Sequence, residues 1–134
     1  MTPTGDAPAW KDPVILAGTD QTITLIDGLT FAISDVLGDI GGDADGLIAD
    51  DTRHLSRLRV SVDGAPLRTL GATQLAPSTA RLRGFVSPDH GRADPTLDVE
   101  RQRTVVPGGL EDELILNLWQ AVPRTVAVRL EVDA

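Results

Sequence analysis

Short runs of alternating apolar and polar residues, joined by glycine-containing turns, dominate this sequence. Alternation with a period of two is typical of a half-buried β-strand, because successive side chains of a strand point to opposite faces. No part of the sequence sustains the apolar stripe of a helix over three turns, although residues 50–58 could begin with a single helical turn after an aspartate cap. The pattern predicts an all-β protein, an antiparallel β-sandwich or open barrel of about eight or more strands with little helix.

Turn residues recur about every 8–12 residues, as expected between short antiparallel strands. Asp27-Gly28 and Asp63-Gly64 can supply the positive φ angles of tight hairpin turns, and Pro107 with its following glycines turns the chain again. The strands are expected at residues 21–25, 29–34, 55–62, 66–70, 82–87, 97–106, 114–119 and 125–132. The side chains expected to face the core in the two clearest patterns are Leu58, Val60, Val62, Val126, Val128, Leu130 and Val132.

Residues 35–46 hold four glycines and four aspartates in twelve positions. This composition predicts a loop whose aspartates accept hydrogen bonds from their own backbone. The segment around Asp43 and Asp45 is similar to the middle of a calcium-binding loop, but Gly41 and Thr52 stand where such a loop needs oxygen ligands. We therefore expect no metal site, and the sequence predicts no cofactor.

Length and composition favour one domain without targeting or membrane segments. The 134 residues predict a flexible leader over residues 1–19 and one β-sandwich domain over residues 20–134. The formal net charge of −8 opposes binding to nucleic acid, since such binding depends on neutralising phosphates. No apolar run is long enough for a signal peptide or a membrane span, and cysteine is absent, so we expect a cytoplasmic protein that binds no membrane.

No constellation of residues predicts catalysis. Asp50, Asp51, His54 and Ser56 lie close in sequence but lack the motif of an oxyanion hole. The carboxylates of residues 111–113 are consecutive, whereas glycoside hydrolysis needs two that face each other across a cleft. Three arginine pairs are spaced two apart and should each project from one strand face, either in ladders with acidic residues or as a surface for another domain: Arg57 and Arg59, Arg81 and Arg83, Arg101 and Arg103.

Four stretches of this sequence, in order, resemble the N-terminal domain of bacterial glycogen-debranching proteins of the amylo-alpha-1,6-glucosidase type. They are residues 31–40, 46–58, 62–70 and 101–110, within a similarity that extends from about Leu25 to the end of the chain. The most specific part is Asp51-Thr52-Arg53, followed by Leu55-Ser56. The resemblance implies a sugar-hydrolase context in which the catalytic carboxylates belong to a large (α/α) toroid that this chain does not include.

From the resemblance we expect a non-catalytic N-terminal β-sandwich that packs on the catalytic toroid of a glycogen-debranching glycoside hydrolase and shapes its α-glucan site. Asp51, Thr52, Arg53 and Ser56 are the candidates for this interdomain or glucan-facing rim. An arginine beside carboxylates can orient a neighbouring domain or sugar hydroxyls. The alternative is that Asp51 and Arg53 only tie their loop to the sandwich. In either case the fragment alone should be inactive.

Two other functions stay open from the sequence, an autonomous carbohydrate-binding module and an oligomerisation module. The few aromatic residues distinguish these two functions, because sugar-binding surfaces usually offer flat rings. Exposure of Trp10 and Trp119 on one face would favour the carbohydrate-binding module. Residues 125–132 present a strand edge that could pair with a second copy, with Arg129 and Glu131 in register. The net charge opposes this pairing, so we expect a weak homodimer that strengthens with salt.

Overall fold

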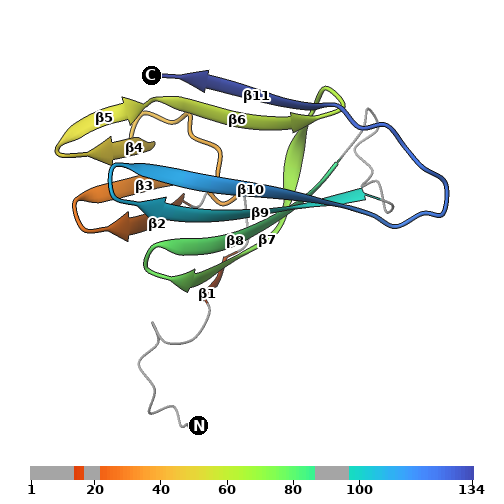
Figure 1. Cartoon of the computed structure of the whole chain (residues 1–134), viewed down its shortest axis with the longest axis horizontal. Helices are drawn as coiled ribbons and strands as arrows, with labels where there is room; N and C mark the ends of the chain where they lie inside the picture. The colour runs from red at the N-terminus through yellow and green to blue at the C-terminus, as the bar shows by residue number, and fades with distance from the viewer. Residues whose placement is uncertain (1–13, 17–21, 87–96) are drawn as a thin grey trace, which may run out of the picture.

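The computed structural model describes residues 14–16, 22–86 and 97–134, and its elements there are β-strands (Figure 1). The strands are β1 (Val14–Leu16), β2 (Thr22–Asp27), β3 (Thr30–Asp35), β4 (Gly46–Ala49), β5 (Thr52–Leu55), β6 (Arg57–Val62), β7 (Ala65–Ala76), β8 (Thr79–Val86), β9 (Leu97–Val106), β10 (Gly109–Leu118) and β11 (Val128–Asp133). β1 falls within the predicted leader and pairs antiparallel to β7. The rest of the leader lies outside the described residues.

The strands form two antiparallel sheets. The larger has the order β10-β9-β8-β7-β6-β11, with β1 paired to β7, and the smaller has the order β2-β3-β4-β5. In Figure 1 the larger sheet curls, so that β6 and β11 lie above β9 and β10. The predicted all-β, antiparallel, sandwich-like architecture is confirmed. The described part of the chain contains no helix with the length and apolarity needed to cross a membrane.

Local turn chemistry explains the hairpins. Asp63 and Gly64 join β6 to β7 with φ of 52° and 76°, the two positive angles of a type I′ turn. In the first hairpin Asp27 pairs with Thr30, so the two-residue connection is Gly28-Leu29 rather than the predicted Asp27-Gly28. Gly28, with φ of 61°, occupies the first central position, where a type II′ turn requires glycine.

The predicted helical turn in residues 50–58 is wrong. Asp50 and Asp51 instead form the turn of the β4–β5 hairpin, with φ of 51° and 63°. Aspartate tolerates the left-handed region better than most residues, so two aspartates can replace the usual glycine-containing pair. The chain then continues as β5 and β6, and the polar residues of the motif lie on a hairpin rather than on a helix.

The loop between β3 and β4 is held by its own aspartates, as predicted. Asp35 Oδ1 accepts hydrogen bonds from the backbone N–H groups of Leu37 and Asp39, both at 2.9 Å, and Asp45 Oδ2 accepts one from Gly42 at 2.9 Å. The loop also contributes to the core, since Ile40 is fully buried and forms an isolated bridge to Leu58 on β6. It therefore packs against β6 through Ile40 and Leu58.

Two hydrophobic clusters make up the core. One joins the two sheets, and the other lies within the curl of the larger sheet beneath β6. The buried members of the first are Ile23, Leu25, Ala32, Val36, Leu47, Ala72, Ala80, Leu82 and Val105, and those of the second are Val62, Val86, Leu97 and Val99. Leu58, Val60 and Val62 are buried as the alternation predicted.

The prediction that β11 buries its apolar face is wrong. Val128, Leu130 and Val132 are 43%, 58% and 55% exposed. They lie opposite Val62, Val60 and Leu58 of β6 and so share the core-facing side of the sheet. β11 is the outermost strand, however, and no described residue covers this side chain row. Val126 alone of the four packs against the core beneath β6.

Candidate functional site

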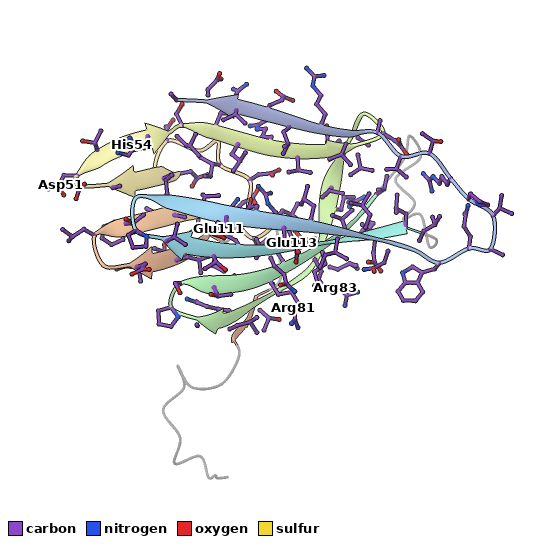
Figure 2. All side chains as sticks on the ribbon, in the orientation of Figure 1. Asp51, His54, Arg81, Arg83, Glu111 and Glu113 are labelled. Atoms are coloured by element: carbon purple, nitrogen blue, oxygen red, sulfur yellow. The ribbon has the colours of Figure 1, made fainter. Side chains whose placement is uncertain are left out.

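The four rim candidates lie together on and beside the β4–β5 hairpin, with Asp51 at its tip (Figure 2). Thr52 Oγ1 lies 3.5 Å from the carbonyl oxygen of Asp50, and both Asp51 and Thr52 are exposed. Ser56 follows β5, and its hydroxyl donates to the carbonyl oxygen of Ala134 at 3.1 Å. The structure thus brings these residues to one end of the sandwich and places the last residue of the chain beside them.

Arg53 has a visible structural task. Its Nη2 donates to the carbonyl oxygen of Asp43 at 2.7 Å, which ties the hairpin to the loop between β3 and β4. Its side chain also packs over Gly46, where an added Cβ would lie 3.1 Å from Arg53 Nε. Nearby, a ring nitrogen of His54 lies 3.3 Å from the carbonyl oxygen of Ala49, so His54 and the hydroxyl of Ser56 contact different backbone groups.

An ionic cluster is built on two buried arginines of β9 and on Asp112 of the edge strand β10, whose side chain is 17% exposed. Sequence reasoning missed the burial of these arginines. Arg101 and Arg103 are 2% and 1% exposed and point inward from β9. Asp112 on β10 accepts from Nε and Nη2 of Arg103, both at 2.7 Å, and from Nε of Arg101 at 2.9 Å. The predicted ladder of arginines against an acidic residue of the neighbouring strand is therefore confirmed at this pair. Its burial was not predicted, although Arg101 and Arg103 alternate in phase with the core residues Leu97 and Val105. That shared phase was the available signal.

The cluster extends to the loop between β3 and β4. Arg101 Nη1 donates to the carbonyl oxygen of Leu37 and to Asp39 Oδ1, both at 3.0 Å. Burial raises the pKa of Asp112, but the hydrogen bonds and charges of Arg103 and Arg101 together outweigh it and hold that pKa below its ordinary value. Among the described residues, Arg101 Nη2 and Arg103 Nη1 have no hydrogen-bond partner. The positive charges of the two guanidinium groups are therefore neutralised by the carboxylates of Asp112 and Asp39, and the loss of either carboxylate would leave a buried charge uncompensated.

The other two arginine pairs lie on the outside, and members of both lie near acidic residues of neighbouring strands, as the ladder interpretation predicted. Arg81 Nε lies 3.8 Å from Glu100 Oε2, and Arg83 Nη2 lies 3.6 Å from Asp98 Oδ2, on the outer face of β8 and β9 (Figure 2). Arg57 pairs loosely with Asp133 at 3.9 Å. Such exposed pairs stabilise a protein only slightly.

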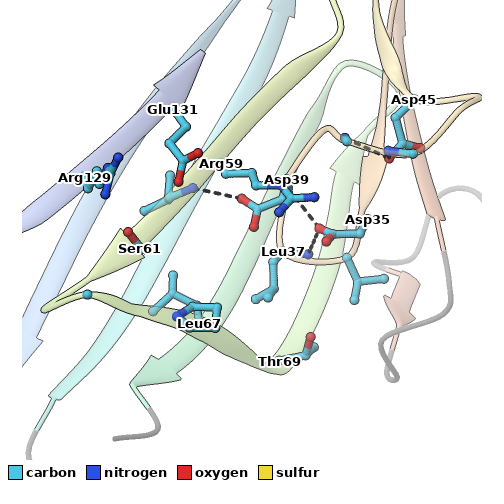
Figure 3. Close-up of a pocket in the computed structure, with 16 residues that line it drawn as sticks. Asp35, Leu37, Asp39, Asp45, Arg59, Ser61, Leu67, Thr69, Arg129 and Glu131 are labelled. Atoms are coloured by element: carbon cyan, nitrogen blue, oxygen red, sulfur yellow. Dashed lines mark hydrogen bonds between the residues drawn. The ribbon is translucent and has the colours of Figure 1, made fainter. Parts of the chain in front are cut away.

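A cavity of about 740 Å³ lies where β7 diverges from β6, beside the loop between β3 and β4 (Figure 3). Its polar lining includes the acidic residues Asp35, Asp39, Asp45 and Glu131 and the basic residues Arg59 and Arg129. Three of these carboxylates already have structural partners: Asp35 and Asp45 accept from backbone N–H groups, and Asp39 Oδ1 accepts from Arg101 and from the backbone N–H of Val60 at 3.2 Å.

Asp35 provides a test of this loop. Burial, and next the charge of Asp39, raise its pKa above 3.8, although two backbone hydrogen bonds lower it. A raised folded-state pKa means that ionisation destabilises the folded protein, increasingly as the pH rises from 3.8 through the folded value. Asp35→Asn keeps an oxygen acceptor without the charge, so we expect a higher urea midpoint than wild type at pH 7 and no difference near pH 3.

The matched variant Asp35→Ala removes both hydrogen bonds along with the charge. It should lower the free energy of unfolding by about 1–3 kcal/mol, the usual cost of leaving partly buried donors unpaired. If Asp35→Asn were as destabilising as Asp35→Ala, the loop would depend on the charge itself rather than on the acceptor.

Two further expectations concern aromatic residues and metals. Trp119 is 66% exposed, and its Nε1 donates to Asp98 Oδ2 at 2.9 Å, while Trp10 lies outside the described residues. The structure therefore shows the exposure of Trp119 but does not test whether Trp10 lies on the same face. Within residues 22–86 and 97–134, no three His, Cys, Asp or Glu side chains group closely enough to hold a metal ion.

Comparison with known proteins places this fold in a family. No curated protein and no solved structure matches the chain. A family model described as the N-terminal domain of some glycogen debranching enzymes matches residues 25–134. The match covers most of the chain, including the β4–β5 hairpin, the buried ionic cluster and β11. The chain therefore belongs to the family of N-terminal domains of glycogen debranching enzymes.

Proposed function

We propose that this domain is a non-catalytic, cytoplasmic part of a glycogen-debranching glycoside hydrolase, which packs on the catalytic toroid and helps to shape its α-glucan site. The family description makes it an N-terminal domain, so in such an enzyme the rest of the polypeptide follows it. The exposed tip of the β4–β5 hairpin supports the proposal most directly, because it presents Asp51 and Thr52 to solvent on an element that Arg53 braces.

The chemistry of this end of the sandwich fits a polar interdomain contact. Asp51 and Thr52 are exposed at the tip of a hairpin whose turn geometry is well determined by two left-handed residues. Arg53 braces the hairpin against the neighbouring loop, so its tip is presented on a supported element rather than on a free loop. Carboxylate and hydroxyl groups so placed can bind either a facing backbone or sugar hydroxyls.

The carboxylates elsewhere in the described residues support a non-catalytic role. A glycoside hydrolase needs one carboxylic acid that stays protonated and a second carboxylate facing it across the scissile bond. Asp112 has a lowered pKa and two arginine partners, which suit a permanently ionised group. Asp35 and Asp39 share a cavity, but their oxygens are engaged by the loop backbone and by Arg101.

The test compares variants in a polypeptide in which residues 1–134 precede the catalytic region. Asp51→Ala should lower kcat/KM on a branched α-glucan by roughly tenfold or more, because a lost hydrogen bond to a charged group costs about 1.5–3 kcal/mol. Glu111→Ala, an exposed change on β10, is the control and should leave kcat/KM unchanged. The isolated domain should release no glucose from limit dextrin.

Three results would contradict the proposal. Equal kcat/KM values for Asp51→Ala and the control would show that the hairpin does not contribute to the glucan site. Glucose release by the isolated domain, abolished by one Asp or Glu substitution, would show that it is catalytic. A second candidate function, autonomous carbohydrate binding, is favoured by the exposed Trp119 that Asp98 holds in place. Retention of the isolated domain in a glycogen gel, lost in Trp119→Ala, would establish that function instead.

A further inference from the structure

We propose that the free edge of β11 is a homodimer interface, in which β11 of a second copy pairs antiparallel to it with the two Leu130 residues facing each other. This inference is independent of the proposed function. It rests on three properties of β11: an unpaired edge, an exposed apolar face, and charges that complement themselves in a single register.

The edge has backbone groups available for pairing. Among the strands of the described residues, β11 is the last of its sheet and pairs with β6 alone. The carbonyl oxygens of Ala127 and Asp133 accept from Asp63 and Ser56 at 2.8 and 2.9 Å, so residues with odd numbers direct their backbone groups toward β6. In an antiparallel ladder the direction alternates, and the even-numbered residues 128, 130 and 132 therefore direct theirs outward.

The apolar side chains belong to the same even-numbered residues. Val128, Leu130 and Val132 are all exposed and continue the core-facing side of the sheet beyond β6. In the proposed register Leu130 faces Leu130 of the second copy, and Val128 faces Val132 of the second copy. Each apolar residue thus gains an apolar cross-strand neighbour, which stabilises antiparallel pairs.

The charges select this register. With the Leu130 residues opposite each other, Arg129 faces Glu131 of the second copy, twice by symmetry. A shift of one residue in either direction on the two-fold axis would place Arg129 opposite Arg129 or Glu131 opposite Glu131. Like charges directly opposite each other destabilise a strand pair. Within the described residues neither Arg129 nor Glu131 forms an ion pair within 4 Å, although Glu131 lies opposite Arg59 of β6 in the same copy.

The other edge of the same sheet has the opposite property. β10 carries Glu111, Asp112 and Glu113 in succession, so pairing two copies of β10 would bring carboxylates together. Such charges on an edge strand prevent association. Homotypic pairing is therefore expected at β11 and not at β10.

The interface is small, and the dimer should be weak. It joins two six-residue strands, whereas stable complexes usually bury about 1,200–2,000 Å². Each copy also carries a formal charge of −8, which opposes association. We expect dissociation constants above about 10 μM, in the range of weak, transient contacts.

Sedimentation equilibrium up to about 1 mM protein, well above a dissociation constant in this range, tests the register by charge exchange. Arg129→Glu and Glu131→Arg change the net charge in opposite directions, yet each should weaken dimerisation at least roughly tenfold, because each places like charges opposite one another. Because Glu131 also lies opposite Arg59 of β6, the charge exchange is compared in an Arg59→Ala background. There the double variant R129E/E131R restores complementarity between copies and the net charge of its parent, and it should dimerise within about threefold of that parent. Glu111→Arg on β10 is the control and should still dimerise.

Several outcomes would overturn the proposal. A wild-type protein that is monomeric at about 1 mM would show that the dimer does not form. A double variant that stays monomeric, although its thermal unfolding matches that of its parent, would show that the proposed register is wrong. Opposite effects of the two single variants would show that net charge, not register, controls association. A dimer in the isolated domain that disappears when the catalytic region follows residue 134 would assign β11 to an intramolecular contact instead.

Discussion

Asp112→Asn is expected to lower the free energy of unfolding by about 3–5 kcal/mol, because removing one partner of a buried ionic group leaves its counter-charges uncompensated. Asp112 is the shared acceptor of Arg101 and Arg103, which are almost completely buried. The amide cannot neutralise either cation, and its N–H₂ group would face guanidinium donors. Urea unfolding at pH 7 measures the loss.

The neighbouring carboxylate supplies the control. Glu113 lies one residue further along β10, on the outward face, and Glu113→Gln should change stability by no more than about 0.5 kcal/mol. A loss of similar size in both variants would mean that the net charge of the strand, rather than the buried cluster, stabilises the fold.

The same substitution has a defined pH dependence. The folded-state pKa of Asp112 lies below the ordinary value of 3.8, so its contribution to stability is complete above 3.8 and is lost as the pH falls through the folded value. Asp112→Asn removes this contribution at every pH. The difference between wild type and variant should therefore be largest at neutral pH and should shrink in strongly acidic solution.

Gly38→Ala is expected to cost about 2–5 kcal/mol, as the sum of about 1–2 for a left-handed backbone and about 1–3 for overpacking. Gly38 has φ of +87°, and an added Cβ would lie 2.8 Å from Leu82 Cδ1 and 3.1 Å from the guanidinium carbon of Arg101. The methyl group would therefore push against the core and the buried cluster together. The urea midpoint measures the combined effect.

Gly64→Ala separates the two causes. Gly64 has φ of +76°, but nothing lies within 4 Å of an added Cβ, so this variant should lose only about 1–2 kcal/mol. Equal losses at the two glycines would show that Leu82 and Arg101 move aside without cost, contrary to the tight packing described here.

The sequence alone predicted the parts of the fold that depend on neighbouring residues. The bounds of β9 were predicted as observed, and the Asp63-Gly64 turn follows directly from residues that accept positive φ. The β4–β5 hairpin was missed because its turn consists of two aspartates without glycine, a weaker local signal. β7 is also longer than predicted, since register shifts interrupt its alternation near Gly71 and Ala76.

The role of the candidate site stays a prediction. The motif around Asp51 was identified through the resemblance to a family, and the contact of Ser56 with Ala134 joins positions 78 residues apart and has no sequence signal. Arg101 and Arg103 could have been assigned to the core from their phase with Leu97 and Val105. Their partner Asp39 could not, because it lies 62 residues from Arg101 on a loop that only the folded sheet brings near.

The sequence by itself determined the all-β architecture and the position of most strands, because backbone preferences and side chain alternation act over a few residues. Only the tertiary structure decided which alternating faces are buried. Val60 and Leu130 follow the same pattern and lie opposite each other, yet Val60 is buried beneath the curled sheet while Leu130 is exposed on its last strand. Burial depends on which segments lie across from a strand, and those contacts join residues that are distant in the chain.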